Sequence, residues 1–152
     1  MKIAIAQRSD GGVSYAPVIR EQRQDETDVE FRGACIRRLQ AEHPSAAILM
    51  VDETALPVNW RDRRWRNAWT WDGATIAIDM MKARDIHRDW LRHLRKPLLE
   101  ALDVAMSRAY KDPMLQDQIE AKRQALRDVT ADIAIESALT IEELVVPDIL
   151  KV

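Results

Sequence analysis

The stretch that decides the fold of the first half of the chain is NWRDRRWRNAWTWDGATIAID, residues 59–79. Three tryptophans on one alternating face are followed by two isoleucines in phase: Trp65, Trp69, Trp71, Ile76 and Ile78. Asp72-Gly73 between them is a two-residue hairpin signal, because glycine supplies the positive φ that such a turn requires. The stretch therefore predicts a β-hairpin in which tryptophans face isoleucines, the cross-strand contacts that stabilise a small sheet.

Four arginines lie among these tryptophans, so a platform for single-stranded nucleic acid is an alternative to packing. Residues 60–96 hold ten Lys or Arg against five Asp, whereas residues 21–30 hold five acids against one Arg and residues 132–152 five acids against one Lys. A net charge of −2 disfavours nucleic acid. The alternation favours packing or protein docking, with only Trp60 out of phase, and the charge layout also suits head-to-tail docking of like subunits.

The residues before this stretch predict a β-β-α-β order. KIAIAQ, residues 2–7, alternates at period two, and a turn at residues 10–12 leads to a second strand in which Pro17 favours an edge position. Thr27 to Glu30 fits a capping box that begins a helix. The apolar run at residues 46–52 predicts a buried strand.

The residues after the stretch predict helices. Asp79 is placed to cap a long helix over residues 80–112, in which Pro97 predicts a kink or break. A second helix follows over residues 115–129, and the short link between them implies an antiparallel helical hairpin. Thr140 to Glu143 fits a second capping box and predicts a short terminal helix.

Together these patterns predict an α+β protein in two parts. Residues 1–79 form a small sheet with one helix and a Trp-rich hairpin, and residues 80–152 form a helical arm. The arm carries an apolar stripe that includes Trp90, Leu94, Leu98 and Leu102, more than one hairpin partner can bury. We expect either the α+β part or a second subunit to cover it. A parallel stripe of Arg84, Arg88, Arg92 and Arg95 is either a solvated face or a contact for an acidic neighbour.

No catalytic or metal-binding constellation is visible, so we expect neither enzyme activity nor a cofactor. Cys35 is the lone cysteine, interpreted as a buried thiol, and His87 and His93 fall on different helix faces, which excludes a shared metal ion. Asp85 and Asp89 each precede an arginine by three residues, which favours surface ion pairs over acid–base catalysis. No apolar run reaches the ~20 residues of a membrane span. We expect a soluble protein made in the cytoplasm.

Two motifs in the second half resemble a family of small bacteriophage proteins encoded among head and tail genes, and the C-terminal module of tail assembly chaperones and tail-fibre assembly proteins. The first motif, R-x-x-LL-x-x-x-D, is formed by Arg95, Leu98, Leu99 and Asp103. The second, RQ-x-LRD, is formed by Arg123, Gln124, Leu126, Arg127 and Asp128. The chain departs from the chaperones at Ile119 and Lys122, where they carry aromatic residues, and at Val104, where they carry tryptophan.

The resemblance implies a structural or accessory tail protein, made in the host bacterial cytoplasm and retained in the virion. It would dock in several copies, or as a homo-oligomer, onto other virion subunits of the tail, fibre or connector. A tail or tail-fibre assembly chaperone absent from the mature particle is the alternative, and a nucleic-acid-binding regulator is a second one. Arg123 and Arg127 would serve as an internal clamp or an interface contact. The candidate partner-binding residues are Trp60, Trp65, Trp69, Trp71, Trp90, Leu94, Leu98, Leu102, Arg123 and Arg127.

Overall fold

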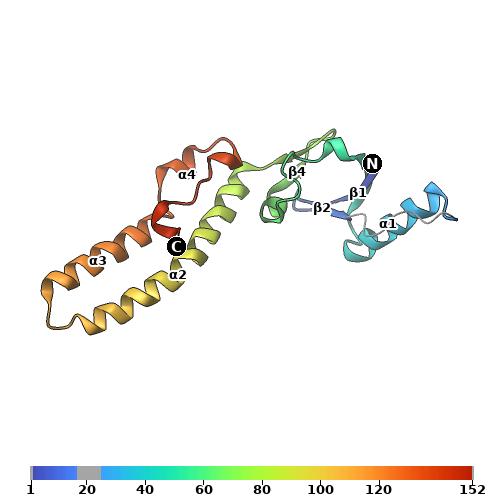
Figure 1. Ribbon diagram of the computed structural model, residues 1–152. Helices are drawn as coiled ribbons and strands as arrows, with labels where there is room; N and C mark the ends of the chain where they lie inside the picture. The colour runs from blue at the N-terminus through green and yellow to red at the C-terminus, as the bar shows by residue number, and fades with distance from the viewer. Residues whose placement is uncertain (1, 17–24, 152) are drawn as a thin grey trace. The chain divides into compact units, whose positions relative to one another are not determined.

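The chain is an α+β protein, in which a small antiparallel sheet precedes a helical region with a helical hairpin, as predicted (Figure 1). The computed structural model describes residues 2–16 and 25–151. Two compact units divide the chain, Met1–Asp79 and Met80–Val152. The edge position predicted for Pro17 falls outside the described residues, and the thiol of Cys35, predicted to be buried, is not among the described side chains.

Three antiparallel strands form the main sheet of the first unit: β1 (Lys2–Gln7), β2 (Val13–Ala16) and β3 (Ala47–Asp52), in the order β2-β1-β3. The predicted turn joins β1 to β2. Gly11 there has a φ of 75°, and the Asp10 carboxylate accepts a hydrogen bond of 2.8 Å from the Gly12 N–H.

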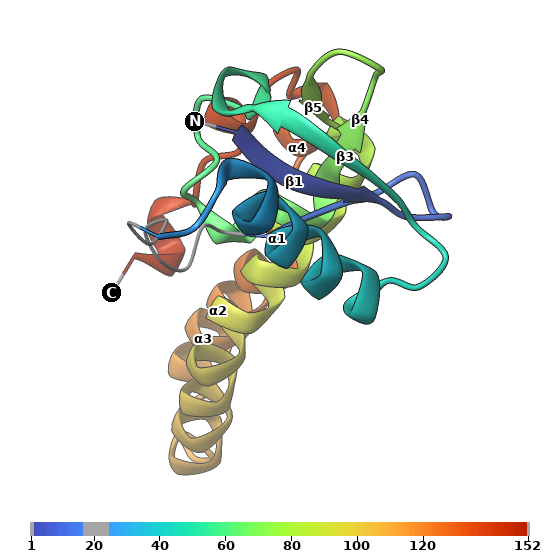
Figure 2. The same cartoon turned by 90° about the vertical axis from the view of Figure 1, so that its right-hand side faces the viewer.

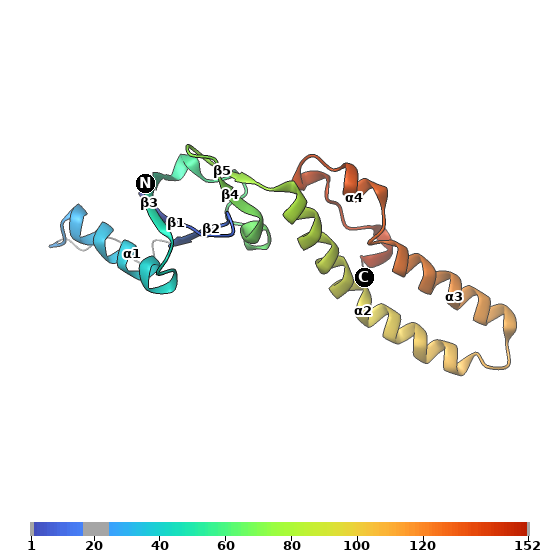
Figure 3. The ribbon, with the colours of Figure 1, turned by 180° about the vertical axis from the view of Figure 1, so that it is seen from behind.

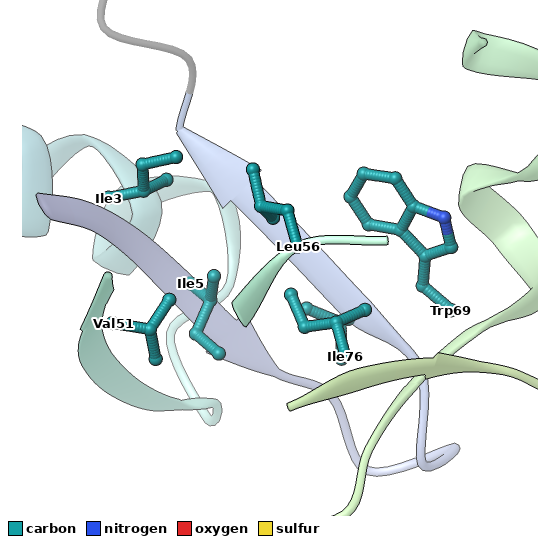
Figure 4. Packing of buried hydrophobic residues seen from close by; sticks show 7 residues of the cluster. Ile3, Ile5, Val51, Leu56, Trp69 and Ile76 are labelled. Carbon is teal, nitrogen blue, oxygen red and sulfur yellow. The ribbon is translucent and has the colours of Figure 1, made fainter. Parts of the chain in front are cut away.

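The alternation of β1 sorts its side chains onto two faces of the sheet. Ala4 and Ala6 face helix α1 (Asp28–Glu42) and pack with Leu39; their small size lets the helix lie against the sheet (Figure 2). The predicted capping box is confirmed, because Thr27 and Glu30 exchange hydrogen bonds at the start of α1. The opposite face is covered by the Trp-rich segment, where these side chains meet (Figure 4): Ile3, Ile5, Val51, Leu56, Trp69 and Ile76.

The Trp-rich stretch forms a shorter hairpin than predicted. Strand β4 (Trp69–Trp71) pairs with β5 (Ile76–Ile78), so that Trp69 lies opposite Ile78 and Trp71 opposite Ile76, as predicted. The strand assignment of Trp65 was wrong. It lies in the 3₁₀ helix η2 (Arg63–Ala68), because the Asp62 carboxylate caps the Arg64 N–H. The three-residue period of η2 buries Trp65 and Ala68 together.

The connection between β4 and β5 has four residues, Asp72 to Thr75, rather than the predicted two. The Asp72 N–H donates to the Thr75 carbonyl at 3.2 Å, and Gly73 takes a φ of 105°. The N–H groups of Thr75 and Ala74 also donate to the Asp72 carboxylate, at 2.7 and 2.8 Å. These bonds stabilise the ionised form and hold the pKa of Asp72 below its usual value.

The second unit is built on a long helix, α2 (Met80–Arg108), and an antiparallel partner, α3 (Pro113–Asp128). Of the kink or break expected at Pro97, the break is absent: the helix continues through this residue, and its ribbon changes direction near the middle (Figures 1 and 3). Asp112 caps α3 through a 3.0 Å bond from the Leu115 N–H, and Pro113 takes the first helical position, where its missing N–H costs nothing.

The residues after α3 fold back along the first half of α2 (Figure 3). They form a short helix, α4 (Ile133–Ser137), and the 3₁₀ turns η3 (Ile141–Glu143) and η4 (Asp148–Leu150). The predicted capping box at Thr140 was wrong, because the Glu143 carboxylate accepts from the Leu139 N–H at 2.6 Å and no side-chain bond caps η3. Buried side chains of this C-terminal segment include Ile135, Ala138, Leu144 and Leu150.

Candidate partner-docking surfaces

Two of the four clustered tryptophans belong to the core of the first unit rather than to a docking surface. The exposed fractions of Trp65 and Trp69 are 2% and 1%, and the Trp69 ring lies 5.4 Å from that of Tyr15. Trp60 and Trp71 are half-buried and pack against the same core. Trp65 and Trp69 are therefore unavailable to a partner or to a stacking base.

Two arginines of this segment, Arg64 and Arg66, lie on aromatic rings. The Arg64 guanidinium is 4.3 Å from the Trp65 ring centroid and forms a 3.4 Å ion pair with Asp62. The Arg66 guanidinium is 4.6 Å from the Tyr15 ring and donates to its hydroxyl. Cation–π contacts thus engage both cations within the unit.

The apolar stripe of α2 divides into a covered part and an open part. Ala83, His87 and Leu91 are buried, in a 4-4 spacing; the sequence pattern includes Ala83 and His87 but continues to Trp90 instead of Leu91. The His87 ring lies 5.9 Å from that of Trp90. The predicted partner-binding residues of the stripe are all half-buried: Trp90, Leu94, Leu98 and Leu102.

Two arginines of the α2 stripe bind the C-terminal segment of the same chain. Arg84 donates to the Ala138 carbonyl at 2.8 Å, and Arg88 pairs with Glu136. Arg88 also pairs with Asp85 at 3.0 Å, which confirms the predicted surface ion pair. The sequence predicted either a solvated face or an acidic neighbour for this stripe. For Arg88 the acidic neighbour is Glu136 of the same chain.

Arg95 closes the hairpin. Its guanidinium donates to the carbonyls of Leu126 (3.3 Å) and Arg127 (2.7 Å) and to the Thr130 hydroxyl (3.3 Å). The carbonyls at a helix C-terminus have no partner within the helix, so a cation there satisfies them and complements the helix dipole.

Replacing Arg95 by methionine is expected to lower the free energy of unfolding by about 1.5–3 kcal/mol, the range for hydrogen bonds to a charged group. Methionine keeps the apolar stem and removes the donors. Arg92→Met is the matched control, because Arg92 is exposed and pairs only with Asp89 in the bonds described, a contact worth about 0–1 kcal/mol. Urea titrations followed by circular dichroism compare the two. Equal losses would refute the role of Arg95.

The two motifs of the second half meet each other across the hairpin. Arg123 of the second motif pairs with Asp103 of the first at 2.7 Å and with Glu120 at 2.8 Å. Arg127 pairs with Glu120 at 2.9 Å, a bond that is the leading cause of the lowered pKa of Glu120. The contacts of Arg123 match the internal clamp, because this residue joins α3 to α2. Arg127 pairs only within its own helix in the bonds described.

The open surface of the second unit carries large apolar side chains. Besides Met81 at the start of α2, they lie near the hairpin turn and in the C-terminal segment: Val104, Tyr110, Met114, Leu115, Ile133, Leu139, Val145 and Ile149. Except for Leu115, which begins the periodic face predicted for the second helix, none of them was selected from the sequence, because all but Val104 lie near helix ends or outside the regular helices, where no period marks a face. Clustered exposed apolar groups mark sites of protein association.

Within residues 2–16 and 25–151, no three His, Cys, Asp or Glu side chains are grouped in a way that could hold a metal ion. None of the helices described has the length and apolarity to cross a membrane. No family model, curated protein or solved structure matches the chain.

Proposed function

We propose that the chain is a structural or accessory protein of a bacteriophage tail that acts by docking onto other virion subunits. The observation that carries the proposal is the apolar end of the hairpin arm. There Tyr110, in the turn between the helices, and Met114 and Leu115, in the first turn of α3, are exposed where the two helices extend beyond the C-terminal segment (Figure 1). An apolar surface of this kind gains free energy when a partner covers it.

The resemblance in the second half supports the phage assignment, since both motifs lie in the arm that presents this surface. The role of the motifs there is architectural. Arg95 and Arg123 hold the two helices together, which keeps the apolar end rigid and lowers the entropic cost of docking. The burial of Trp65 and Trp69 favours a protein partner over nucleic acid, because a stacking platform needs free indole faces.

The test is mass spectrometry of purified particles of the phage that encodes the chain, grown on its bacterial host. A virion component is expected to stay with the particles through density-gradient purification, at a constant ratio to the major tail subunit. Recovery with a tail subunit from the lysate but not with particles would replace the proposal by the assembly chaperone. Absence from both fractions would overturn it.

A further inference from the structure

The C-terminal segment encloses an apolar pocket against α2. Its volume is about 190 Å³, and its walls include Leu91, Val129, Ile135 and Leu144. These four side chains are themselves buried, whereas Asp132, Ala134 and Glu143, which also line the pocket, are exposed, so the pocket has apolar walls and an open side. A dry apolar cavity of about 150 Å³ can admit a benzene-sized group, so this pocket has room for one aliphatic side chain.

The rim of the pocket is acidic. Asp132 and Glu143 both line it, and each carboxylate accepts a backbone N–H, from Ala134 at 2.9 Å and from Leu139 at 2.6 Å. These donors are neutral, so they orient the carboxylates without cancelling their charge. The pocket therefore favours an apolar side chain that is accompanied by a cation.

The first unit presents such a side chain. Val58 is 96% exposed and lies in a turn closed by the Trp60 N–H, which donates to the Pro57 carbonyl at 2.9 Å. Arg61 and Arg63 follow, and both are exposed. Val29, the other strongly exposed valine of this unit, is flanked by Asp28 and Glu30 and would be repelled by an acidic rim.

We propose that the pocket of one copy receives Val58 of a second copy, with Arg61 and Arg63 facing the carboxylates of Asp132 and Glu143. The inference rests on the proposed docking function and names a second copy of the chain as one partner. Because donor and acceptor surfaces differ, the contact is heterologous. When two copies associate, one still has a free pocket and the other a free Val58, which we call the knob. Further copies can therefore add, and the contact builds rings or open stacks.

Sedimentation velocity of the full chain over a wide concentration range tests the proposal. The wild type is expected to form species larger than a dimer, and added salt is expected to weaken them. Val58→Asp, which places an unpaired charge in the apolar pocket, is expected to weaken association more than tenfold. Ala134→Trp, which fills the pocket from an exposed lining position, has the same expected effect. Val29→Asp is the control and should associate like the wild type.

Mixing the two defective variants gives the sharpest outcome. Val58→Asp keeps its pocket and Ala134→Trp keeps its knob, so an equimolar mixture is expected to form one contact per pair and stop at a heterodimer. A monomeric wild type, a Val58→Asp variant that associates normally, or a mixture that stays monomeric would each overturn the inference. A monomeric chain still recovered with particles would leave the tail function standing, which separates the two failures.

Discussion

Replacing Trp69 by alanine is expected to lower the free energy of unfolding of the first unit by about 3–5 kcal/mol, the cost of deleting a buried tryptophan side chain. The indole is 1% exposed and lies between the sheet and strand β5, where Ile5 and Ile76 contact the same cluster (Figure 4). Its removal leaves a cavity beside the Tyr15 ring, because the surrounding structure relaxes only in part.

The measurement is urea unfolding followed by tryptophan fluorescence in a Trp90→Phe background. That change leaves Trp60, Trp65, Trp69 and Trp71, all in the first unit, as the reporters of its unfolding. Trp71→Ala is the matched control from the same strand. It is half-exposed, so it should cost at most about half as much, because burial energy scales with the apolar area removed from water. Losses of equal size would contradict the core position of Trp69.

Short-range sequence signals explain which elements of the first unit could be predicted. The glycine turn, the Thr27 capping box and the alternation of β1 each specify structure over a few residues, and all three were predicted correctly. Trp65 was misassigned because tryptophans spaced four and two apart fit both a strand and a helical turn. Asp62 decided between them as an N-cap, a signal visible in the sequence just before Trp65.

Long-range contacts explain what the sequence could not predict in the second unit. The helices and the Asp112-Pro113 boundary follow from period and capping. The return of the C-terminal segment does not, because residues 129–150 have no sustained period and their positions depend on α2. The partners of Arg84 and Arg95 lie 54 and 31–35 residues away, so their roles follow from tertiary packing alone.

The candidate site illustrates the same division. Sequence reasoning selected the inner stripe Leu94, Leu98 and Leu102, which is half-buried, and the clamp residue Arg123, because these follow helical spacing or a motif. The exposed apolar end at Tyr110 and Met114 lies at the turn between helices. Which side chains stay exposed there depends on how the unit packs. A search for motifs therefore finds the residues that hold the arm together and misses those on its exposed surface.

Leu126 of the second motif tests that distinction. Its side chain is 3% exposed between α3 and its neighbours, and Leu126→Ala is expected to lower the free energy of unfolding of the second unit by about 2–5 kcal/mol. Leu115→Ala, the same change at a 42% exposed position of the same helix, should cost less than about 1 kcal/mol. The identical chemistry cancels differences in helix propensity, so burial alone separates the two variants.

Hydrogen exchange of the α2 and α3 amides in the full chain measures both variants and separates the second unit from the first. Protection is expected to fall across both helices in Leu126→Ala. The hairpin opens as one body once the contacts of Arg95 and Arg123 between the helices are weakened. In Leu115→Ala protection should persist while incorporation into particles drops, since this side chain belongs to the exposed apolar end. Equal protection in the two variants would refute the assignment of Leu126 to the fold and of Leu115 to docking.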